Sequence, residues 1–351
     1  MNPIANLQRR LGILRHAGLV AFLIGTAAAI GLVDWSGVDS VGQALASVGW
    51  GVLAVVMIRV VTVSLAGVGW WLIFPAKDRP PLMTCILLRF IREGGNVLLT
   101  QVGGDLIGAR LLAVRDYPGP LAAASVTVDV LLQAATQLLF AAIGIGLLVV
   151  LGASSALAEA AAIGLAIAAL LLGGFYLAQR DTGRRIVRWA IGNLIGDRKW
   201  PLLGTIDAVY EALGSLYAER TNLITSTVTH FVGWVVGVAE VLVVFGFMDV
   251  PVGLGEAFVI ESLLHAIRGA AFVIPSALGA QEGGLILLCA IFGIPPGEAI
   301  ALSLVKRAAD LVVGGPSLLG WQMLEWRELI PQFSASRQHH RGSTDGPGRD
   351  R

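Results

Sequence analysis

Long apolar runs alternate with shorter polar segments along the chain. The apolar core of a lipid bilayer is about 30 Å thick, and a helix of roughly 20 residues crosses it. The pattern therefore predicts an all-α, polytopic membrane helix bundle. The six clearest candidate spans are Ala17–Val33, Val52–Phe74, Val126–Leu151, Ala160–Ala178, Leu223–Phe247 and Ala299–Leu319.

Two further stretches, Pro81–Ala113 and Pro251–Phe292, are apolar but are interrupted by charged residues, Gly and Pro. Short loops rich in Lys and Arg stay on the cytoplasmic side of a membrane. On this rule we predict that both chain termini are cytoplasmic and that the two stretches enter the bilayer from opposite faces. Each stretch must return to the face it entered from, either as a re-entrant hairpin or as a pair of short spans.

The two interrupted stretches also resemble each other in sequence. Ile91–Asp105 can be aligned with Ile267–Glu282, which places Arg92 opposite Arg268. Similar segments that enter from opposite faces predict two inverted repeats, each with a broken or re-entrant helix pair. Inverted repeats are typical of secondary transporters, whose substrate sites lie near the bilayer midplane.

We expect a single membrane domain over residues 1–325, with repeat halves at about 52–151 and 223–325. Residues 180–220 between the halves are rich in basic residues, and we predict an amphipathic cytoplasmic loop there that includes an interfacial helix. Residues 326–351 are mostly polar, and the sequence predicts a disordered cytoplasmic tail.

Composition narrows the class of protein further. Charged residues make up 14% of the 351 residues and hydrophobic residues 56%, whereas an ordinary soluble domain carries roughly 25% charged residues. These proportions exclude a soluble globular enzyme, a disordered protein and a nucleic-acid-binding protein with a basic face. The cysteines and histidines are few and scattered, so we predict no metal site and no cofactor.

The second interrupted stretch contains a helix break. Pro275 removes a backbone donor, and Gly279 and Gly283 permit tight turns. A new helix is expected from about Gly283 to Phe292. Its N-terminus would carry free N–H groups and a positive dipole end, which favour a lipid phosphate or carboxylate.

Charged and amide side chains flank the breaks in both halves. Arg268 can hold a phosphate through paired hydrogen bonds, and Glu282 can pair with Arg268, exchange a proton or cap the new helix. The alternative in each half is a helix cap or an interfacial helix whose charges are solvated. The substrate-binding residues that we predict are Arg92, Asn96, Asp105, Arg110, Arg268, Pro275, Gly279, Gln281, Glu282, Arg307 and Asp310.

Further ionisable residues lie within the apolar spans, where a charge costs about 2.5–3.5 kcal/mol at a helix centre. Arg59 and Glu240 either face the bundle interior or extend along the helix to the membrane surface. His230 is interpreted as a hydrogen-bonded packing residue. His265 shares a helix face with Glu261, which indicates a polar cluster.

Three segments of the second half carry a family resemblance. They are PSALGAQEGG, FGIPPGEAIALSLVKRA and GWQ. Together with the glycine-rich residues 96–110, they resemble the lysylphosphatidylglycerol-synthase transmembrane family, whose members are also called flippase-like proteins. The resemblance is closest to the hopanoid-biosynthesis-associated branch and covers about residues 10–325.

The resemblance implies a lipid translocase of the bacterial inner membrane. In two-domain members the membrane part moves a lipid, and a separate soluble domain aminoacylates it. Only a short polar segment follows the last span here, so we expect this chain not to be an enzyme. The family's proline-glycine-glutamate break corresponds to Pro275, Gly279 and Glu282, and its flanking bases correspond to Arg268 and Arg307.

The leading hypothesis is a transporter for a polar or anionic lipid, such as a hopanoid or a phospholipid. Its expected partners are the lipid substrate, the bilayer and lipid-biosynthesis enzymes, with no nucleic acid. One alternative is a membrane scaffold of a lipid-biosynthesis complex. The other is a membrane-embedded enzyme that modifies a lipid headgroup, with His265 and either Glu261 or Glu282 as acid and base.

Overall fold

The protein is described from a computed structural model in which every regular element of the described residues is helical. The all-α prediction is therefore confirmed for this part of the chain. The described residues are 30–32, 34–35, 38–98, 103–152, 155–194, 199–271 and 274–341.

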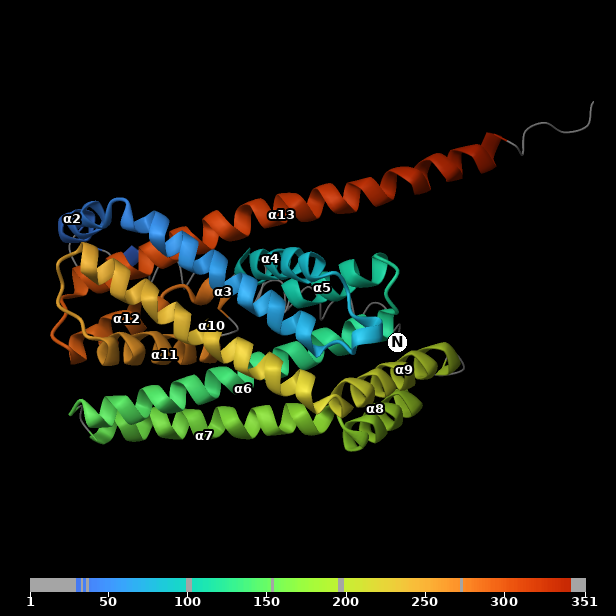
Figure 1. Cartoon of the computed structure of the whole chain (residues 1–351), viewed down its shortest axis with the longest axis horizontal. Coiled ribbons are helices and arrows are strands. Elements are labelled where there is room, and N and C mark those ends of the chain that lie inside the picture. Colours follow the sequence, from blue (N-terminus) through green and yellow to red (C-terminus); the bar gives the residue numbers. More distant parts are fainter. Residues whose placement is uncertain are drawn as a thin grey trace, which may run out of the picture.

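The helices form one elongated bundle, in which most of the long helices run roughly along the long axis (Figure 1). In chain order they are α2 (Val38–Val48), α3 (Gly51–Ile73), η1 (Ala76–Asp78), α4 (Leu82–Leu98), α5 (Gly103–Val114), α6 (Gly119–Val150), α7 (Ser155–Ala178), α8 (Asp181–Leu194), α9 (Lys199–Ala218), α10 (Arg220–Phe247), α11 (Leu254–Ala270), η2 (Pro275–Ala277), α12 (Ala280–Ile291) and α13 (Pro296–Arg341).

Four of these helices are long and apolar enough to cross a membrane, namely α3, α6, α7 and α10. They contain four of the predicted spans, so the chain has the character of a multi-pass membrane protein. The predicted span 299–319 is helical and belongs to α13, where it includes three charged residues. The predicted span 17–33 lies almost wholly outside the described residues.

Each interrupted stretch folds into two short helices. The first forms α4 with 17 residues and α5 with 12, and the second forms α11 with 17 residues and α12 with 12. A helix of 12 residues is about 18 Å long, which is too short to cross a bilayer core of about 30 Å. In Figure 1 the α11–α12 pair lies in the left half of the bundle and the α4–α5 pair in the right half.

The residues aligned between the two halves occupy matching places in these helices. Gly103 begins α5, and its counterpart Gly279 immediately precedes α12. Pro118 immediately precedes α6, and Pro296 begins α13. Proline suits the first turn of a helix because its fixed φ is already helical and its missing N–H would have no intrahelical partner.

Buried apolar side chains gather in two clusters, one on each side of a polar layer. On α3, Arg59 lies between the two clusters, and on α6 Gln133 and Gln137 do so. We call the two groups the α12-side cluster and the α9-side cluster. The α12-side cluster includes Val55, Phe140 and Val241, and the α9-side cluster includes Trp70, Val128 and Leu216.

The basic segment 180–220, predicted as an amphipathic loop, folds into helices α8 and α9. Leu213 and Leu216 of α9 are buried in the α9-side cluster. Ile186 and Trp189 of α8 are exposed, with 59% and 69% of their surface accessible. An exposed apolar face on a basic helix is typical of a helix that lies in the membrane interface.

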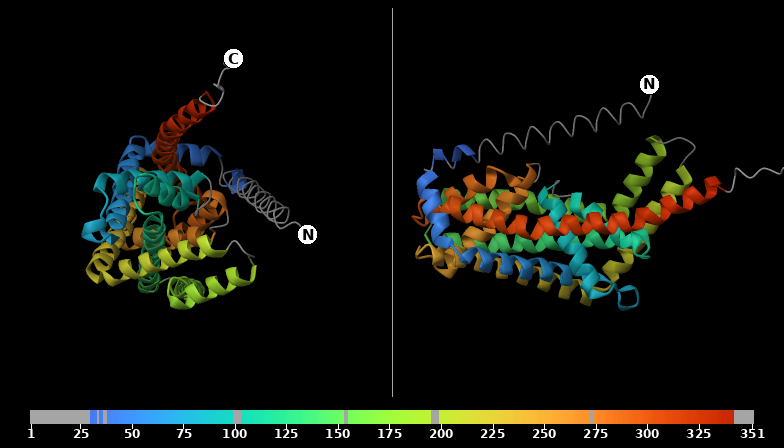
Figure 2. Two further views of the ribbon diagram at one scale, coloured as in Figure 1. Left: turned by 90° about the vertical axis from the view of Figure 1, so that its right-hand side faces the viewer. Right: turned by 90° about the horizontal axis from the view of Figure 1, so that it is seen from above.

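The predicted tail differs from the structure over half of its length. Helix α13 has 46 residues and continues to Arg341, so residues 326–341, predicted to be disordered, are helical. The helix projects beyond the bundle at the end where α8 and α9 lie (Figures 1 and 2). Residues 342–351 lie outside the described part of the chain.

Close backbone contacts hold the α4–α5 pair together. A Cβ atom on Gly104 would overlap the backbone oxygen of Arg92 and approach Asn96 Oδ1 to 2.7 Å. The Gly104 N–H also donates to Asn96 Oδ1 at 2.9 Å. Any side chain at this position must therefore push α5 away from α4.

We predict that Gly104→Ala lowers stability by about 1–3 kcal/mol, because overpacking a tight contact forces the backbone to shift. The measurement is the apparent melting midpoint of the purified protein in detergent. The matched control is Gly164→Ala in α7, where a Cβ atom would meet nothing within 4 Å. Equal midpoints for the two variants would contradict the close packing of α4 on α5.

Candidate functional site

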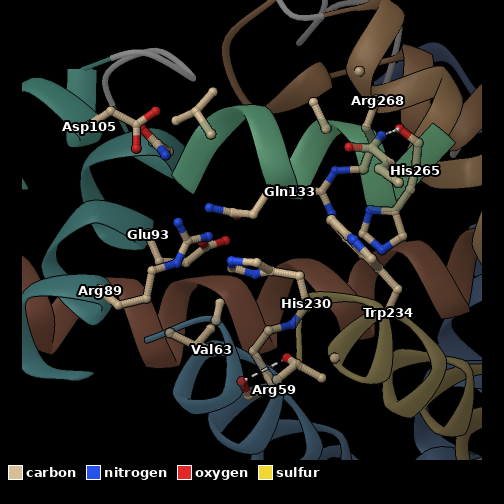
Figure 3. A pocket seen from close by; sticks show the side chains of 18 of the residues that line it. Arg59, Val63, Arg89, Glu93, Asp105, Gln133, His230, Trp234, His265 and Arg268 are labelled. Atoms are coloured by element: carbon tan, nitrogen blue, oxygen red, sulfur yellow. Dashed lines mark hydrogen bonds and ion pairs between the residues drawn. The ribbon is translucent and has the colours of Figure 1, made fainter. Parts of the chain in front are cut away.

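A polar cavity of about 410 Å³ lies between the two pairs of short helices. Helices α3, α4, α5, α6, α10 and α11 and the segment η2 contribute side chains to its wall (Figure 3). Asn96 and Asp105 come from the tip of the α4–α5 pair, and Arg268 and Ser276 come from the tip of the α11–α12 pair. The cavity thus joins the two breaks, which are far apart in the sequence.

Arginines and carboxylates line the cavity together with amides and two imidazoles. The labelled side chains in Figure 3 enter from several sides, with Arg89 and Glu93 opposite His265 and Trp234. Gln133 extends from α6 into the space between these groups. Such a wall offers hydrogen-bond donors and acceptors to a polar ligand.

The first charged group, which we call the Asp129 cluster, stands behind the α4 side of the cavity. Asp129 is fully buried, and Arg92 Nη1 lies 2.7 Å from its Oδ2. His230 Nε2 lies 3.0 Å from Asp129 Oδ1, and the Gln133 amide donates to Oδ2 at 2.7 Å. The members of the Asp129 cluster are Arg89, Arg92, Glu93, Asp105, Asp129 and His230.

Arg92 is the centre of the Asp129 cluster. Its guanidinium donates to Asp105 Oδ1 at 3.0 and 2.8 Å and lies 4.8 Å from the ring centroid of Trp70. The Trp70 indole donates in turn to Ser125 Oγ at 3.2 Å. Arg92 therefore joins α4 to α5, α6 and α3 in a fixed geometry.

The second charged group, which we call the Lys306 cluster, stands behind the α11 side of the cavity. The fully buried Lys306 Nζ lies 2.6 Å from Glu240 and 2.9 Å from Glu261. His265 Nε2 lies 3.1 Å from Glu261 Oε1. The members of the Lys306 cluster are Arg59, Glu240, Glu261, His265, Arg268, Lys306 and Asp310.

Arg59 connects the Lys306 cluster to the cavity. It lies 2.8 Å from Glu240 and 3.4 Å from Asp310, and Asp310 also lies 3.3 Å from Arg268. The effective cost of burying one ion is several kcal/mol unless geometry and hydrogen bonds compensate it. The alternation of positive and negative groups supplies that compensation inside the bundle.

Some donors in the cavity wall remain without a partner. Arg59 and Arg89 are each 8% exposed, and within the described part of the chain the Nε–H of each lacks a hydrogen bond. A buried N–H without a partner costs about 1–3 kcal/mol. Both arginines belong to the cavity wall, so they place positive charge beside the cavity.

Glu282 belongs to a separate group outside the cavity wall. Its carboxylate accepts the Gly279 N–H at 2.8 Å as a cap of α12, and Arg307 donates to it at 2.6 and 3.0 Å. Ser303 Oγ also donates to Glu282 at 2.9 Å. Of the alternatives for Glu282, the pair with Arg268 is therefore wrong, since Glu282 pairs with Arg307 and Arg268 pairs with Asp310.

The helix N-terminus predicted as an anion site already receives an anion from the chain itself. Glu282 Oε2 accepts the N–H of Gly279, the residue that caps α12. The alternative interpretation of Glu282 as a helix cap is thus confirmed. The cap and the ion pair with Arg307 together fix the start of α12 against α13 at the helix break of the second half.

The structure brings only part of the predicted residue set to the cavity. Asn96, Asp105 and Arg268 line it, and Arg92 and Asp310 stand directly behind them as ion-pair partners. Arg110, Gly279, Gln281, Glu282 and Arg307 are not among the cavity residues. Arg110 is exposed on α5, and Gly279, Gln281 and Arg307 belong to the group around Glu282. Pro275 begins η2, and its side chain lies outside the described part of the structure.

Sequence interpretation was wrong or incomplete for several residues of the site. The alternative in which Arg59 and Glu240 extend to the membrane surface is wrong, because they pair in the interior at 2.8 Å. His230 is buried with Nε2 3.0 Å from Asp129 Oδ1, and it also lines the cavity. Cavity residues outside the predicted substrate-binding set include Arg89, Glu93, Gln133, Gln137 and Trp234.

The spacing of polar residues along α4 and α6 could have identified most of these residues from the sequence. Arg89, Glu93 and Asn96 recur at intervals of three and four residues, which places them on one face of α4. The same spacing relates Gln133 and Gln137 on α6. A polar stripe on an otherwise apolar membrane helix indicates a face that points to a cavity or to other polar groups.

Comparison with known proteins identifies the family. The family model described as "Lysylphosphatidylglycerol synthase TM region" matches residues 19–317. The chain belongs to this family. No curated protein and no solved structure matches the chain.

The family match confirms the resemblance inferred from the sequence, while the hopanoid-associated branch stays a prediction. With its apolar helices, the chain is an integral, multi-pass membrane protein related to lipid modification or transport. Within the described residues, no group of three or more His, Cys, Asp or Glu residues is suited to hold a metal ion.

We predict that Glu282→Gln lowers stability by about 1–3 kcal/mol, because it removes a charged partner from Arg307. The matched control is Glu256→Gln, since Glu256 makes the same cap at the exposed start of α11, to the Gly253 N–H at 2.8 Å. Melting midpoints in detergent report the difference. Equal losses in the two variants would mean that the Arg307 pair contributes nothing beyond the cap.

Proposed function

We propose that this protein is a lipid transporter of flippase type in the bacterial inner membrane. It moves a polar or anionic lipid, such as a hopanoid or a phospholipid, between the leaflets. The observation that supports this proposal best is the polar cavity of about 410 Å³ between the two pairs of short helices. Family membership adds the link to membrane lipids.

The cavity offers a lipid headgroup a polar path through the apolar bundle. A charged group at the centre of a bilayer is costly, and Arg59, Arg89 and Arg268 in the cavity wall offset that cost for an anionic or hydroxyl-rich head. The acyl or polycyclic part of the lipid stays outside, against helices with apolar exposed faces. Helix α10, which also lines the cavity, has such a face, which includes Val228, Val232 and Val235.

The two pairs of short helices supply the moving parts in this proposal. The equal lengths of α4 and α11, and of α5 and α12, support an inverted repeat. Because Asp105 and Arg268 come from opposite tips, movement of one half against the other opens the cavity to alternate sides. Broken helices at the interface of two repeats are the usual site of such alternating access. Both chain termini are cytoplasmic in this arrangement.

We predict that Arg268→Gln lowers lipid translocation by about 10-fold, because a hydrogen bond to a charged group contributes about 1.5–3 kcal/mol. The measurement is the movement of a labelled anionic phospholipid and of a polar hopanoid in proteoliposomes. The matched control is Arg110→Gln, which changes an exposed arginine of α5 outside the cavity wall and should move lipid at the wild-type rate.

The same assay separates this proposal from the two alternatives. Folded wild-type protein that moves neither lipid would contradict transport. Mass spectrometry that finds a covalently altered headgroup would favour the enzyme. A scaffold predicts that Arg268→Gln is tolerated in cells, whereas changes in the exposed face of α8 are not.

A further inference from the structure

The charges of the Lys306 cluster are balanced when His265 is neutral. Within the described residues, its ion pairs join three carboxylates to three guanidinium or ammonium groups. The carboxylates are Glu240, Glu261 and Asp310, and the cations are Arg59, Arg268 and Lys306. Net charge in a buried, low-dielectric region is costly, so this balance stabilises the empty cavity.

An anionic ligand disturbs the balance. Two of the three cations, Arg59 and Arg268, line the cavity. The Nε–H of Arg59 has no hydrogen-bond partner among the described residues. A monoanionic headgroup bound to them leaves the cluster with one excess negative charge. One proton taken up by the cluster restores neutrality.

His265 is placed to take that proton. Its side chain is 14% exposed and lines the cavity, while Nε2 faces Glu261 Oε1 at 3.1 Å. If Nε2–H donates to Glu261, Nδ1 carries the lone pair and receives a proton from cavity water.

Charged and polar groups surround His265 on each packed helix. On α11 itself these are Glu261 and Arg268, and on α13 Lys306 reaches Glu261. On α10 the ring of Trp234 meets the imidazole edge-on at 4.7 Å. On α6 the Gln137 amide donates to the His265 backbone oxygen at 2.8 Å.

On α12, which packs against α11, the carboxylate of Glu282 is paired with Arg307. Of the groups on these helices, Glu261 is the carboxylate in contact with the imidazole. It is therefore the group that stabilises a protonated His265.

Alternating charges connect His265 to the anion-binding arginine. The path runs through Glu261, Lys306 and Glu240 to Arg59, with successive contacts of 3.1, 2.9, 2.6 and 2.8 Å. A proton on His265 draws Glu261 away from Lys306, so Lys306 holds Glu240 more strongly. Glu240 then holds Arg59 less strongly, and the guanidinium is released to bind the headgroup.

From this geometry we propose that the cavity binds one lipid anion together with one proton on His265. Binding equilibria that share a charge network are reciprocal: the proton strengthens anion binding, and the anion strengthens proton binding. Building on the proposed transport function, the lipid and the proton then cross in the same direction. The protein would thus be a proton-coupled lipid transporter.

His230 is the competing candidate for the coupled proton. It contacts Asp129 at 3.0 Å, and its ring packs tightly against Gly69, where a Cβ atom would come within 2.7 Å. In the Asp129 cluster, three carboxylates face two guanidinium groups among the described residues. The carboxylate that His230 contacts is thus already paired with Arg92, whereas His265 contacts the Lys306 cluster, whose cations Arg59 and Arg268 line the cavity.

The first experiment measures binding without transport. Short-chain phosphatidylglycerol is titrated into the detergent-solubilised protein by calorimetry, at about pH 5.5 and about pH 8, in buffers that differ in ionisation enthalpy. We expect affinity to be higher at the lower pH, on the order of 10-fold, with about one proton taken up per lipid. Inorganic phosphate serves as a second probe, and weaker binding of phosphate identifies the lipid headgroup as the ligand.

Three variants assign the proton. His265→Gln should lose both the pH dependence and the proton uptake and keep the weaker affinity of wild type at high pH. His339→Gln in the last turn of α13 is the matched control and should behave as wild type. Loss of the pH dependence in His230→Gln but not in His265→Gln would overturn the assignment, as would no binding of either probe to folded wild-type protein.

Proteoliposomes then distinguish failure of the coupling from failure of transport. Labelled phosphatidylglycerol and an internal pH indicator are followed under an imposed pH gradient. If the rate of lipid movement does not change with the pH gradient and no proton moves with the lipid, the coupling is overturned and the transport function stands. Proton-linked binding with no lipid movement overturns the transport function instead. Coupled movement in wild type, uncoupled in His265→Gln, supports both.

Discussion

The structure depends on the ion pairs that its buried charges, in the described part of the chain, form inside an apolar bundle. Lys306 is the clearest case, because its ammonium group is fully buried and is held between Glu240 and Glu261 at 2.6 and 2.9 Å. Removing one partner of a buried pair is strongly destabilising, since an uncompensated charge is left behind. The contacts of Lys306 therefore fix α10, α11 and α13 relative to one another. The same requirement, applied to Arg92, fixes α4, α5 and α6.

The cavity lies where two pairs of short helices end inside the bundle. Their 12-residue members are too short to fill the thickness of the bundle, so their tips end within it. Asn96, Asp105, Arg268 and Ser276 are carried there. The helix ends at the tips have backbone N–H and C=O groups without intrahelical partners. Non-helical backbone at membrane depth is tolerated where it is buried in protein or lines a water-filled cavity. The break in each half and the cavity between the halves thus have the same physical cause.

Glu282 illustrates how a functional motif can be a structural device. A proline, glycines and a glutamate at a helix start are typical of an anion site, but the glutamate itself accepts the Gly279 N–H and pairs with Arg307. The carboxylate thus occupies a position that an external anion would otherwise take. The cavity wall carries other positive groups, those of Arg59, Arg89 and Arg268. The residues that hold the break are therefore not the residues proposed to bind a ligand.

Local patterns in the sequence determined the helical architecture, because the run of apolar residues needed to cross a bilayer is a property of consecutive positions. They also determined the break at Pro275 and the family, which segments around Gly279 carry. Which charges meet was decided only by the tertiary structure. Arg59 and Glu240 are 181 residues apart and pair at 2.8 Å. Nothing local distinguishes an arginine that reaches the membrane surface from one whose partner is brought to it by a distant helix.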